Sequence, residues 1–160
     1  KWRVAFAKKY DLIVAPFRVF MHLMTVEQQL KALDKVYHYL NPGGTFIFDL
    51  FIPNIEMMAE GVNNVHDFDG EYEPGMMLHR FTTMHADPVN QISHITFRFV
   101  WQEGEEGISS DWNTELRLVF RYELEHLLYR SKFKNYQIYG DFLGRELTEE
   151  SKEFVVVCKR

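Results

Sequence analysis

Hydrophobic and polar positions follow several distinct patterns along the chain, and the first of them predicts a strand. Residues 10–15 form a short apolar run without helical spacing, and Pro16 follows directly. Such a run is typical of a buried strand, and a proline disfavours its continuation. We therefore expect a buried strand that ends near Ala15.

The next segment has the spacing of an amphipathic helix. Its apolar residues recur every three or four positions, at Val26, Leu30, Leu33, Tyr37 and Leu40. Thr25 and Gln28 fit a capping box, in which each side chain accepts a hydrogen bond from the backbone N–H of the other residue. The pattern predicts a helix from Thr25 to about Leu40.

A Leu-Asn-Pro-Gly-Gly sequence at 40–44 is expected to end this helix. Asn41 can take the left-handed conformation, Pro42 cannot continue the helix, and the two glycines permit a sharp turn. Residues 45–52 are then almost continuously apolar, as expected of a strand covered on both faces. A strand, a crossing helix and a second strand predict a parallel pair.

The pattern changes to alternation in the middle of the chain. Residues 77–85 and 92–102 flank a turn-rich connector and predict an antiparallel hairpin, and residues 112–120 predict a third strand. The acidic segment 104–107 and the polar segment 60–75 are expected to be loops. Large alternating apolar residues usually pack in a core, which is the simplest interpretation of the aromatic residues here.

Helical spacing returns at Phe120, Leu124, Leu127 and Leu128 and predicts a helix that ends near Ser131. The segments 133–139 and 154–159 are strand-like. The first and last parts of the chain together predict an α/β fold.

Four segments in this order resemble class I S-adenosylmethionine-dependent methyltransferases. The strand at 10–14, the Phe20-x-His22-Leu23-x-Thr25 helix start, the turn at 40–44 and Phe-Asp-Leu-Phe-Ile-Pro at 48–53 look like the fourth strand, following helix and fifth strand of that family. Residues 139–159 are similar to the way small-molecule members close their sheets. The resemblance implies a partial Rossmann-like sheet with family strands 4, 5, 6 and 7, the last antiparallel, plus an inserted antiparallel β-meander.

The resemblance also implies how the chain is organised. We expect a single domain over 1–160 that corresponds to the C-terminal portion of the methyltransferase fold, with 54–120 as an insertion or lid region. Family members begin with a strand and a Gly-rich turn that approaches the cofactor. None of the nine glycines belongs to a G-x-G pair that opens a helix. The hypothesis is therefore a fragment whose intact parent binds S-adenosyl-L-methionine.

The resemblance places the cofactor at the loop after the first strand, because ligands of open parallel sheets bind outside the carboxyl ends of the strands. In the family this loop meets the methionine part of the cofactor. The candidate cofactor-binding residues are Ala15, Pro16, Phe17, Arg18, Phe20 and His22. An aromatic ring at Phe20 could face the sulfonium cation. The alternatives are a core position for Phe20 and a backbone hydrogen bond for His22.

Methyl transfer from a sulfonium depends on alignment more than on acid–base chemistry, so we assign no catalytic residue. A base would help an alcohol or phenol acceptor, and His22, Asp49 or a histidine of the insertion could serve, although a buried, partnered Asp49 is the simpler interpretation. His79, His85 and His94 fall on neighbouring predicted strands. Because no cysteine lies in these predicted strands and their carboxylates have no fixed spacing, we predict no metal site.

Charge and cysteine content narrow the partners. The chain has 18 basic and 23 acidic side chains, a net charge of −5, and no block of Lys or Arg, which disfavours nucleic acid as the main partner. The single cysteine, Cys158, permits no internal disulfide and fits a reducing cytoplasm as a small buried hydrophobe. No apolar run approaches the ~18 residues of a membrane span. We expect a cytoplasmic enzyme that methylates a small molecule.

An alternative from another class is a non-catalytic α/β binding or assembly module. An unpaired apolar strand edge invites pairing, so such a module would form a homo-oligomer through the edge of its first strand or through the insertion. A different α/β nucleotide enzyme is disfavoured because the sequence contains no phosphate-binding loop.

Overall fold

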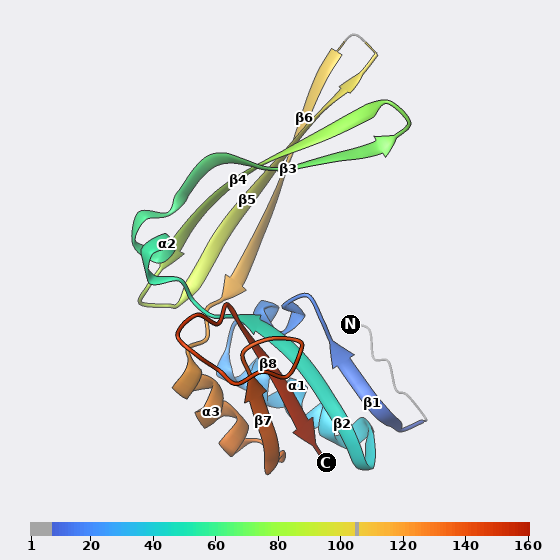
Figure 1. Cartoon of the computed structure of the whole chain (residues 1–160), viewed down its shortest axis with the longest axis vertical. Coiled ribbons are helices and arrows are strands. Elements are labelled where there is room, and N and C mark those ends of the chain that lie inside the picture. Colours follow the sequence, from blue (N-terminus) through green and yellow to red (C-terminus); the bar gives the residue numbers. More distant parts are fainter. Residues whose placement is uncertain (1–7, 105) are drawn as a thin grey trace. The chain divides into compact units, whose positions relative to one another are not determined.

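The computed structural model describes residues 8–104 and 106–160, which form two compact units (Figure 1). The first unit combines the described residues up to Pro53 with Leu118–Arg160, and the second unit is Asn54–Arg117. The chain therefore leaves the first unit once and returns to it.

A four-stranded sheet forms the centre of the first unit. Its strands are β1 (Tyr10–Ala15), β2 (Leu40–Phe51), β7 (Asn135–Tyr139) and β8 (Glu153–Lys159), in the order β1-β2-β8-β7. β1 and β2 are parallel, whereas β8 is antiparallel to both of its neighbours. The predicted parallel pair and the antiparallel last strand are both confirmed.

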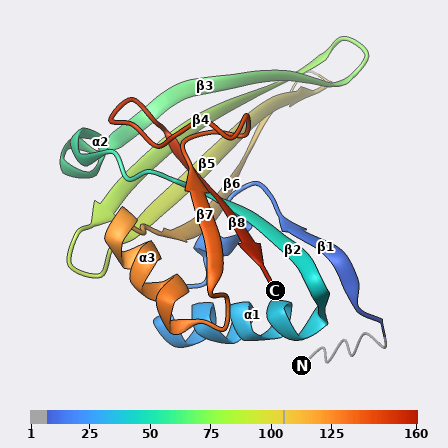
Figure 2. The same cartoon turned by 60° about the horizontal axis from the view of Figure 1, so that its bottom comes forward.

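Two α-helices cover one face of this sheet (Figure 2). They are α1 (Val26–Tyr39) and α3 (Arg121–Arg130), and the short 3-10 helix η1 (Val19–His22) lies between β1 and α1. The predicted capping box is present, because the Thr25 hydroxyl accepts from the Gln28 backbone at 3.2 Å and the Gln28 side chain accepts from the Thr25 backbone at 3.2 Å. Local chemistry thus sets the start of α1.

The core lies between this sheet and its helices. Pairing aligns Phe46, Phe48 and Leu50 of β2 with Cys158, Val156 and Phe154 of β8, and all six are buried together with Leu33, Leu124 and Leu128 of the helices. Burial raises the pKa of the Cys158 thiol to about 12. The neutral thiol is therefore a small core hydrophobe, as predicted.

The strand β1 is less buried than its sequence predicts. The side chains of Leu12 and Val14 are 56% and 54% exposed. β1 is an edge strand, and Val14 pairs with Ile47, which faces away from the buried Phe46 and Phe48. The apolar run predicts the strand correctly but not its surroundings, because periodicity reports conformation and not what covers it.

The turn after α1 also differs from expectation. β2 begins at Leu40 without an intervening left-handed asparagine, and Gly43 takes the positive φ of 81° instead of Asn41. The Asn41 side chain donates a hydrogen bond to Asp11 at 2.8 Å. A Cβ atom on Gly44 would lie 2.9 Å from the Asn41 carbonyl oxygen, so this glycine is required by close backbone approach.

The second unit is an antiparallel sheet with the order β3-β4-β5-β6. It contains α2 (Ile55–Glu60) and the strands β3 (Val62–Glu73), β4 (Met76–Asp87), β5 (Ile92–Glu103) and β6 (Glu106–Arg117). The predicted meander is present. The loop predicted at 60–75 is wrong, because most of this segment is strand β3. The residues of β3 are mostly exposed. The strand therefore lacks the alternation of apolar and polar residues by which a half-buried strand is predicted.

The end of α3 uses a serine in place of a left-handed residue. The Ser131 hydroxyl donates to the Leu128 carbonyl at 2.7 Å and accepts from the Phe133 backbone at 3.1 Å. Within residues 8–104 and 106–160, no helix has the length and apolar character needed to cross a membrane.

Candidate functional site

The chain turns sharply where β1 ends, at the carboxyl edge of the parallel pair. Phe17 and Arg18 have φ values of 58° and 59°, and η1 follows immediately. A left-handed conformation costs a non-glycine residue about 1–2 kcal/mol. Two such residues in succession persist only where surrounding contacts hold them, and such backbone is enriched at binding sites.

Arg18 supplies those contacts. Its backbone N–H donates to Asp49 Oδ1 at 3.4 Å, and its Nε lies 3.3 Å from Asp49 Oδ2. The guanidinium also pairs with Glu153 and lies 4.1 Å from the centre of the Phe51 ring. One side chain thereby joins the loop after β1 to the end of β2 and the start of β8.

Asp49 is the buried member of this cluster. Its residue is 1% exposed, whereas the Arg18 side chain is 22% exposed. A buried carboxylate requires a charged or hydrogen-bonding partner, and Arg18 provides the charge, although neither its Nε nor Asp49 Oδ2 has a hydrogen-bond partner among the described residues. The structure therefore favours the structural interpretation of Asp49 over a role as general base.

The predicted cofactor-binding residues occupy different environments. Ala15 is half-buried at the end of β1, Pro16 is exposed, and Phe17 is 85% exposed. Phe20 is buried in η1 with its ring centre 4.5 Å from that of Phe48, so its side chain is part of the core. His22 is exposed at the end of η1. The exposed loop surface is thus formed by residues 16 and 17, with Arg18 beneath them.

A groove of about 530 Å³ follows the carboxyl end of β7. Residues between Gly140 and Glu153 line it, including Asp141 and Arg145. The backbone N–H of Arg145 is the main reason that the pKa of Asp141 lies below its usual value. A Cβ atom on Gly140 would lie 2.8 Å from the Glu146 carbonyl oxygen, so the close packing of this loop requires glycine.

Glu153 connects the groove to the Arg18 cluster, because it lines the one and pairs with the other. Neither Glu153 nor Asp141 is among the site residues predicted from the sequence. Two signals could have found them: Asp141 follows the carboxyl end of β7, which runs in the same direction as β1 and β2, and antiparallel pairing places Glu153 opposite Phe51. The cluster and the groove together define the candidate site of the first unit.

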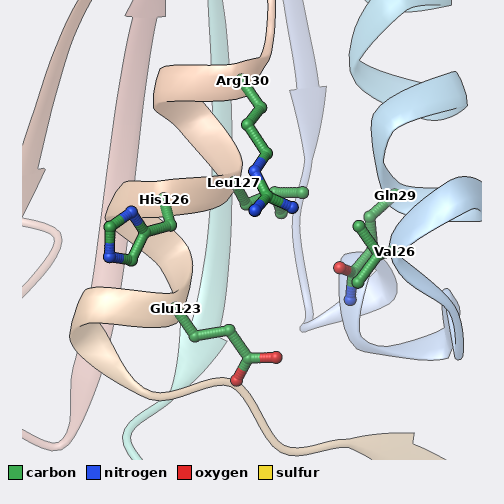
Figure 3. A pocket seen from close by; sticks show the side chains of 6 residues that line it. All are labelled: Val26, Gln29, Glu123, His126, Leu127 and Arg130. Carbon is green, nitrogen blue, oxygen red and sulfur yellow. The ribbon is translucent and has the colours of Figure 1, made fainter.

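A second cavity, of about 450 Å³, lies between the two helices. Figure 3 shows Val26 and Gln29 of α1 opposite Glu123, Leu127 and Arg130 of α3, with the His126 imidazole directed away from α1. The Gln29 side chain donates to the Leu23 carbonyl at 3.1 Å and is thereby occupied. Because the cavity lies on the helical layer and not at the strand ends, it is a weaker candidate for a cofactor.

The histidines of the second unit form two groups. His85 and His94 are cross-strand partners whose rings stack with centres 4.7 Å apart. His79 does not join them, because its Nδ1 lies 2.5 Å from Asp69 Oδ1. Neighbouring strands thus bring His85 and His94 together as suggested, whereas the His79 ring lies 5.7 Å from that of His66 and not beside those two.

Comparisons with known proteins identify the fold. No family model and no curated protein matches the sequence. Among solved structures, an S-adenosylmethionine-dependent methyltransferase from Clostridium acetobutylicum superposes with a TM-score of 0.75 at 16% identity, over 98% of this chain and 61% of that one. The CcbJ methyltransferase from Streptomyces caelestis gives a TM-score of 0.72 at 20% identity, over 94% of this chain and 61% of that one.

A third solved structure names a substrate class. CalS10 from Micromonospora echinaspora, an amino pentose methyltransferase solved with S-adenosylmethionine bound, gives a TM-score of 0.64 at 15% identity, over 99% of this chain and 61% of that one. The chain therefore spans about three-fifths of the length of these structures. At such identities the similarity shows the fold: a partial Rossmann-like methyltransferase fold, as predicted.

Proposed function

We propose that this chain is the C-terminal part of an S-adenosyl-L-methionine-dependent methyltransferase that acts on a small-molecule acceptor. The observation that carries the proposal is the sheet: a parallel pair with a crossing helix, closed by an antiparallel last strand, in the fold of known methyltransferases. On this proposal, residues 54–120 are an insertion or lid of the parent enzyme.

The loop after β1 is the proposed contact for the methionine part of the cofactor. Residues 15–18 would bind through backbone groups and the exposed Phe17, while the Arg18 side chain positions the loop by its contacts with Asp49 and Glu153. Phe20 would support this surface from the core, and His22 would border it. When bound, the cofactor supplies an electrophilic methyl group, and the protein contributes alignment of the acceptor.

A small-molecule acceptor fits the known relatives of this fold. CalS10 is an amino pentose methyltransferase and KedS8, with a TM-score of 0.71, is a sugar N-methyltransferase. A nucleophilic amine needs no strong general base once it is neutral. This agrees with the described residues of the Arg18 cluster, where Asp49 is paired with Arg18 and is not free to act as a base. A cytoplasmic location fits the reduced, buried Cys158.

Calorimetric titration with S-adenosylhomocysteine tests this proposal. The 160-residue chain is expected to bind at least about a hundredfold more weakly than a polypeptide extended by the residues encoded before Lys1, because the chain lacks a Gly-rich loop. Adenosine alone serves as the control titrant. Micromolar affinity in the 160-residue chain would contradict the fragment hypothesis, and no binding by the extended polypeptide would contradict the methyltransferase.

The exposed strand β1 favours one alternative, an assembly module that forms a homodimer through this edge. Leu12 and Val14 are more than half exposed on an edge strand, and such strands pair readily. This function predicts a dimer in sedimentation velocity that Leu12→Lys converts to monomer, whereas Leu143→Lys, at a residue 79% exposed in the β7–β8 connection, leaves it unchanged. A monomeric wild-type chain would exclude the alternative.

A further inference from the structure

The strand β3 carries a β-bulge that rearranges its side chains. β3 is the edge strand of its sheet, and its pairing with β4 shifts between His66 and Phe68. Residues three apart on a regular strand face opposite sides, but the bulge adds one residue. His66 therefore pairs with Phe81 while Asp69 pairs with His79, and all four lie on one face.

The residue inside the bulge confirms this geometry. Asp67 lies on the opposite face, where its carboxylate accepts from Arg80 Nε at 2.9 Å and from the Thr82 hydroxyl at 2.8 Å. The bulge thus places the two aspartates of β3 on opposite faces. Asp67 pairs with an arginine, and Asp69 is left to the histidines.

His66, Asp69 and His79 converge on a single point. The His66 Nε2 lies 2.7 Å from Asp69 Oδ1, and the His79 Nδ1 lies 2.5 Å from the same oxygen. One ligand atom from each of the three residues lies within 4.8 Å of the others. The His66 ring stacks on Phe81 at 4.9 Å, which restricts its orientation. Three donors from two strands are therefore already directed at one another.

We propose that His66, Asp69 and His79 bind a divalent first-row transition-metal ion of the zinc type, which fastens the edge strand β3 to β4. Two imidazoles and one carboxylate form a three-residue donor set of the kind that zinc accepts with a fourth position open to water. The side chains are 43–50% exposed, so an ion can enter from solvent and keep a water ligand.

The binding step replaces hydrogen bonds by metal bonds. Each imidazole binds through a deprotonated nitrogen, so any proton that it shares with Asp69 is released to solvent or moves to its other ring nitrogen. Small side-chain rotations at this exposed site would bring the donors to the ~2.0–2.2 Å of zinc ligation. This inference is independent of the proposed methyl transfer, because all three residues lie in the second unit.

A second histidine pair provides a matched control. The rings of His85 and His94 stack face to face, and the His94 Nδ1 lies 2.9 Å from Glu115 Oε1. Stacked rings do not direct two nitrogen donors at one point, so this pair is not expected to bind an ion. His85→Gln removes an imidazole of the same sheet without touching the proposed site.

Titration of the untagged chain with Zn²⁺ tests the proposal, because a polyhistidine tag would itself bind the metal. We expect one Zn²⁺ per chain with micromolar affinity, and visible absorption bands of tetrahedral Co²⁺ in the substituted protein. His79→Gln and Asp69→Asn should each weaken binding at least tenfold, whereas His85→Gln should leave it unchanged. Thermal unfolding in chelator checks that each variant is folded, and His66→Gln replaces any variant that is not.

Hydrogen exchange provides a second readout of the same site. Zn²⁺ should slow amide exchange in β3 of the wild type and not in His79→Gln, because the ion joins β3 to β4. Affinity weaker than millimolar, an equal loss of affinity in His85→Gln, or unchanged β3 exchange at saturating Zn²⁺ would each overturn the proposal.

Discussion

Replacing Arg18 by methionine is expected to lower the free energy of unfolding by about 3 kcal/mol, because a buried carboxylate loses its partner. Asp49 is 1% exposed, and the Arg18 Nε lies 3.3 Å from its Oδ2. Methionine keeps most of the aliphatic length of arginine, and both residues carry the same penalty at a φ of 59°. Urea unfolding at neutral pH measures the change.

A double variant separates charge from packing. Adding Asp49→Asn to Arg18→Met removes the unpaired charge, so the double variant should recover most of the stability that Arg18→Met loses. Arg98→Met is the surface control, since Arg98 pairs with Asp111 at 2.9 Å with its side chain 52% exposed and its loss should leave stability nearly unchanged. A double variant as unstable as Arg18→Met would show that the charge is not the cause.

The contacts of Arg18 with Asp49 and Glu153, here called the Arg18 network, also hold the left-handed loop after β1 in place. Arg18 contacts Glu153, which is 135 positions later in the sequence, so the loop after β1 is tied to a strand formed at the other end of the chain. Preorganised backbone groups bind ligands with less loss of conformational entropy. The Arg18 network thus connects the stability of the first unit to the shape of the proposed cofactor loop.

The features that the sequence predicted well depend on neighbouring residues. The capping box of Thr25 and Gln28 needs residues only three positions apart, and the parallel pair follows from a strand, helix and strand in succession. The candidate cofactor loop is placed by the same logic, because ligand sites lie at the carboxyl ends of parallel strands, and its role stays a prediction. Local propensity and global fold agree in this part of the chain.

The features that the sequence did not predict depend on distant residues. The partner of Asp49 was expected but not named, because nothing local to β2 points to Arg18. The sequence predicts a loop where β3 forms, because an exposed edge strand has polar residues on both faces and its conformation is set by its pairing with β4. The meeting of His66 and Asp69 depends on a bulge, which the residue pattern does not reveal.

Replacing Phe133 by alanine is expected to cost about 3–5 kcal/mol, the usual range for a large buried aromatic. Phe133 is 0% exposed and lies between α3 and β7. Its ring centre is 5.2 Å from that of Tyr37 on α1, in an edge-to-face arrangement, and 6.2 Å from that of Phe46 on β2. The truncation would leave a cavity where the helical layer meets the sheet, so the urea midpoint should fall with an unchanged slope.

A graded series shows whether lost volume is the cause of this effect. Phe133→Leu fills part of the cavity and should lose less than half as much stability as Phe133→Ala, because the penalty grows with the volume left empty. Phe142→Ala is the matched control, since Phe142 is 62% exposed and its truncation should change stability by no more than about 0.5 kcal/mol. Equal losses of stability in Phe133→Leu and Phe133→Ala would instead assign the stabilisation to the aromatic contacts with Tyr37 and Phe46. A loss in Phe142→Ala as large as that in Phe133→Ala would contradict the position of the core between the helices and the sheet.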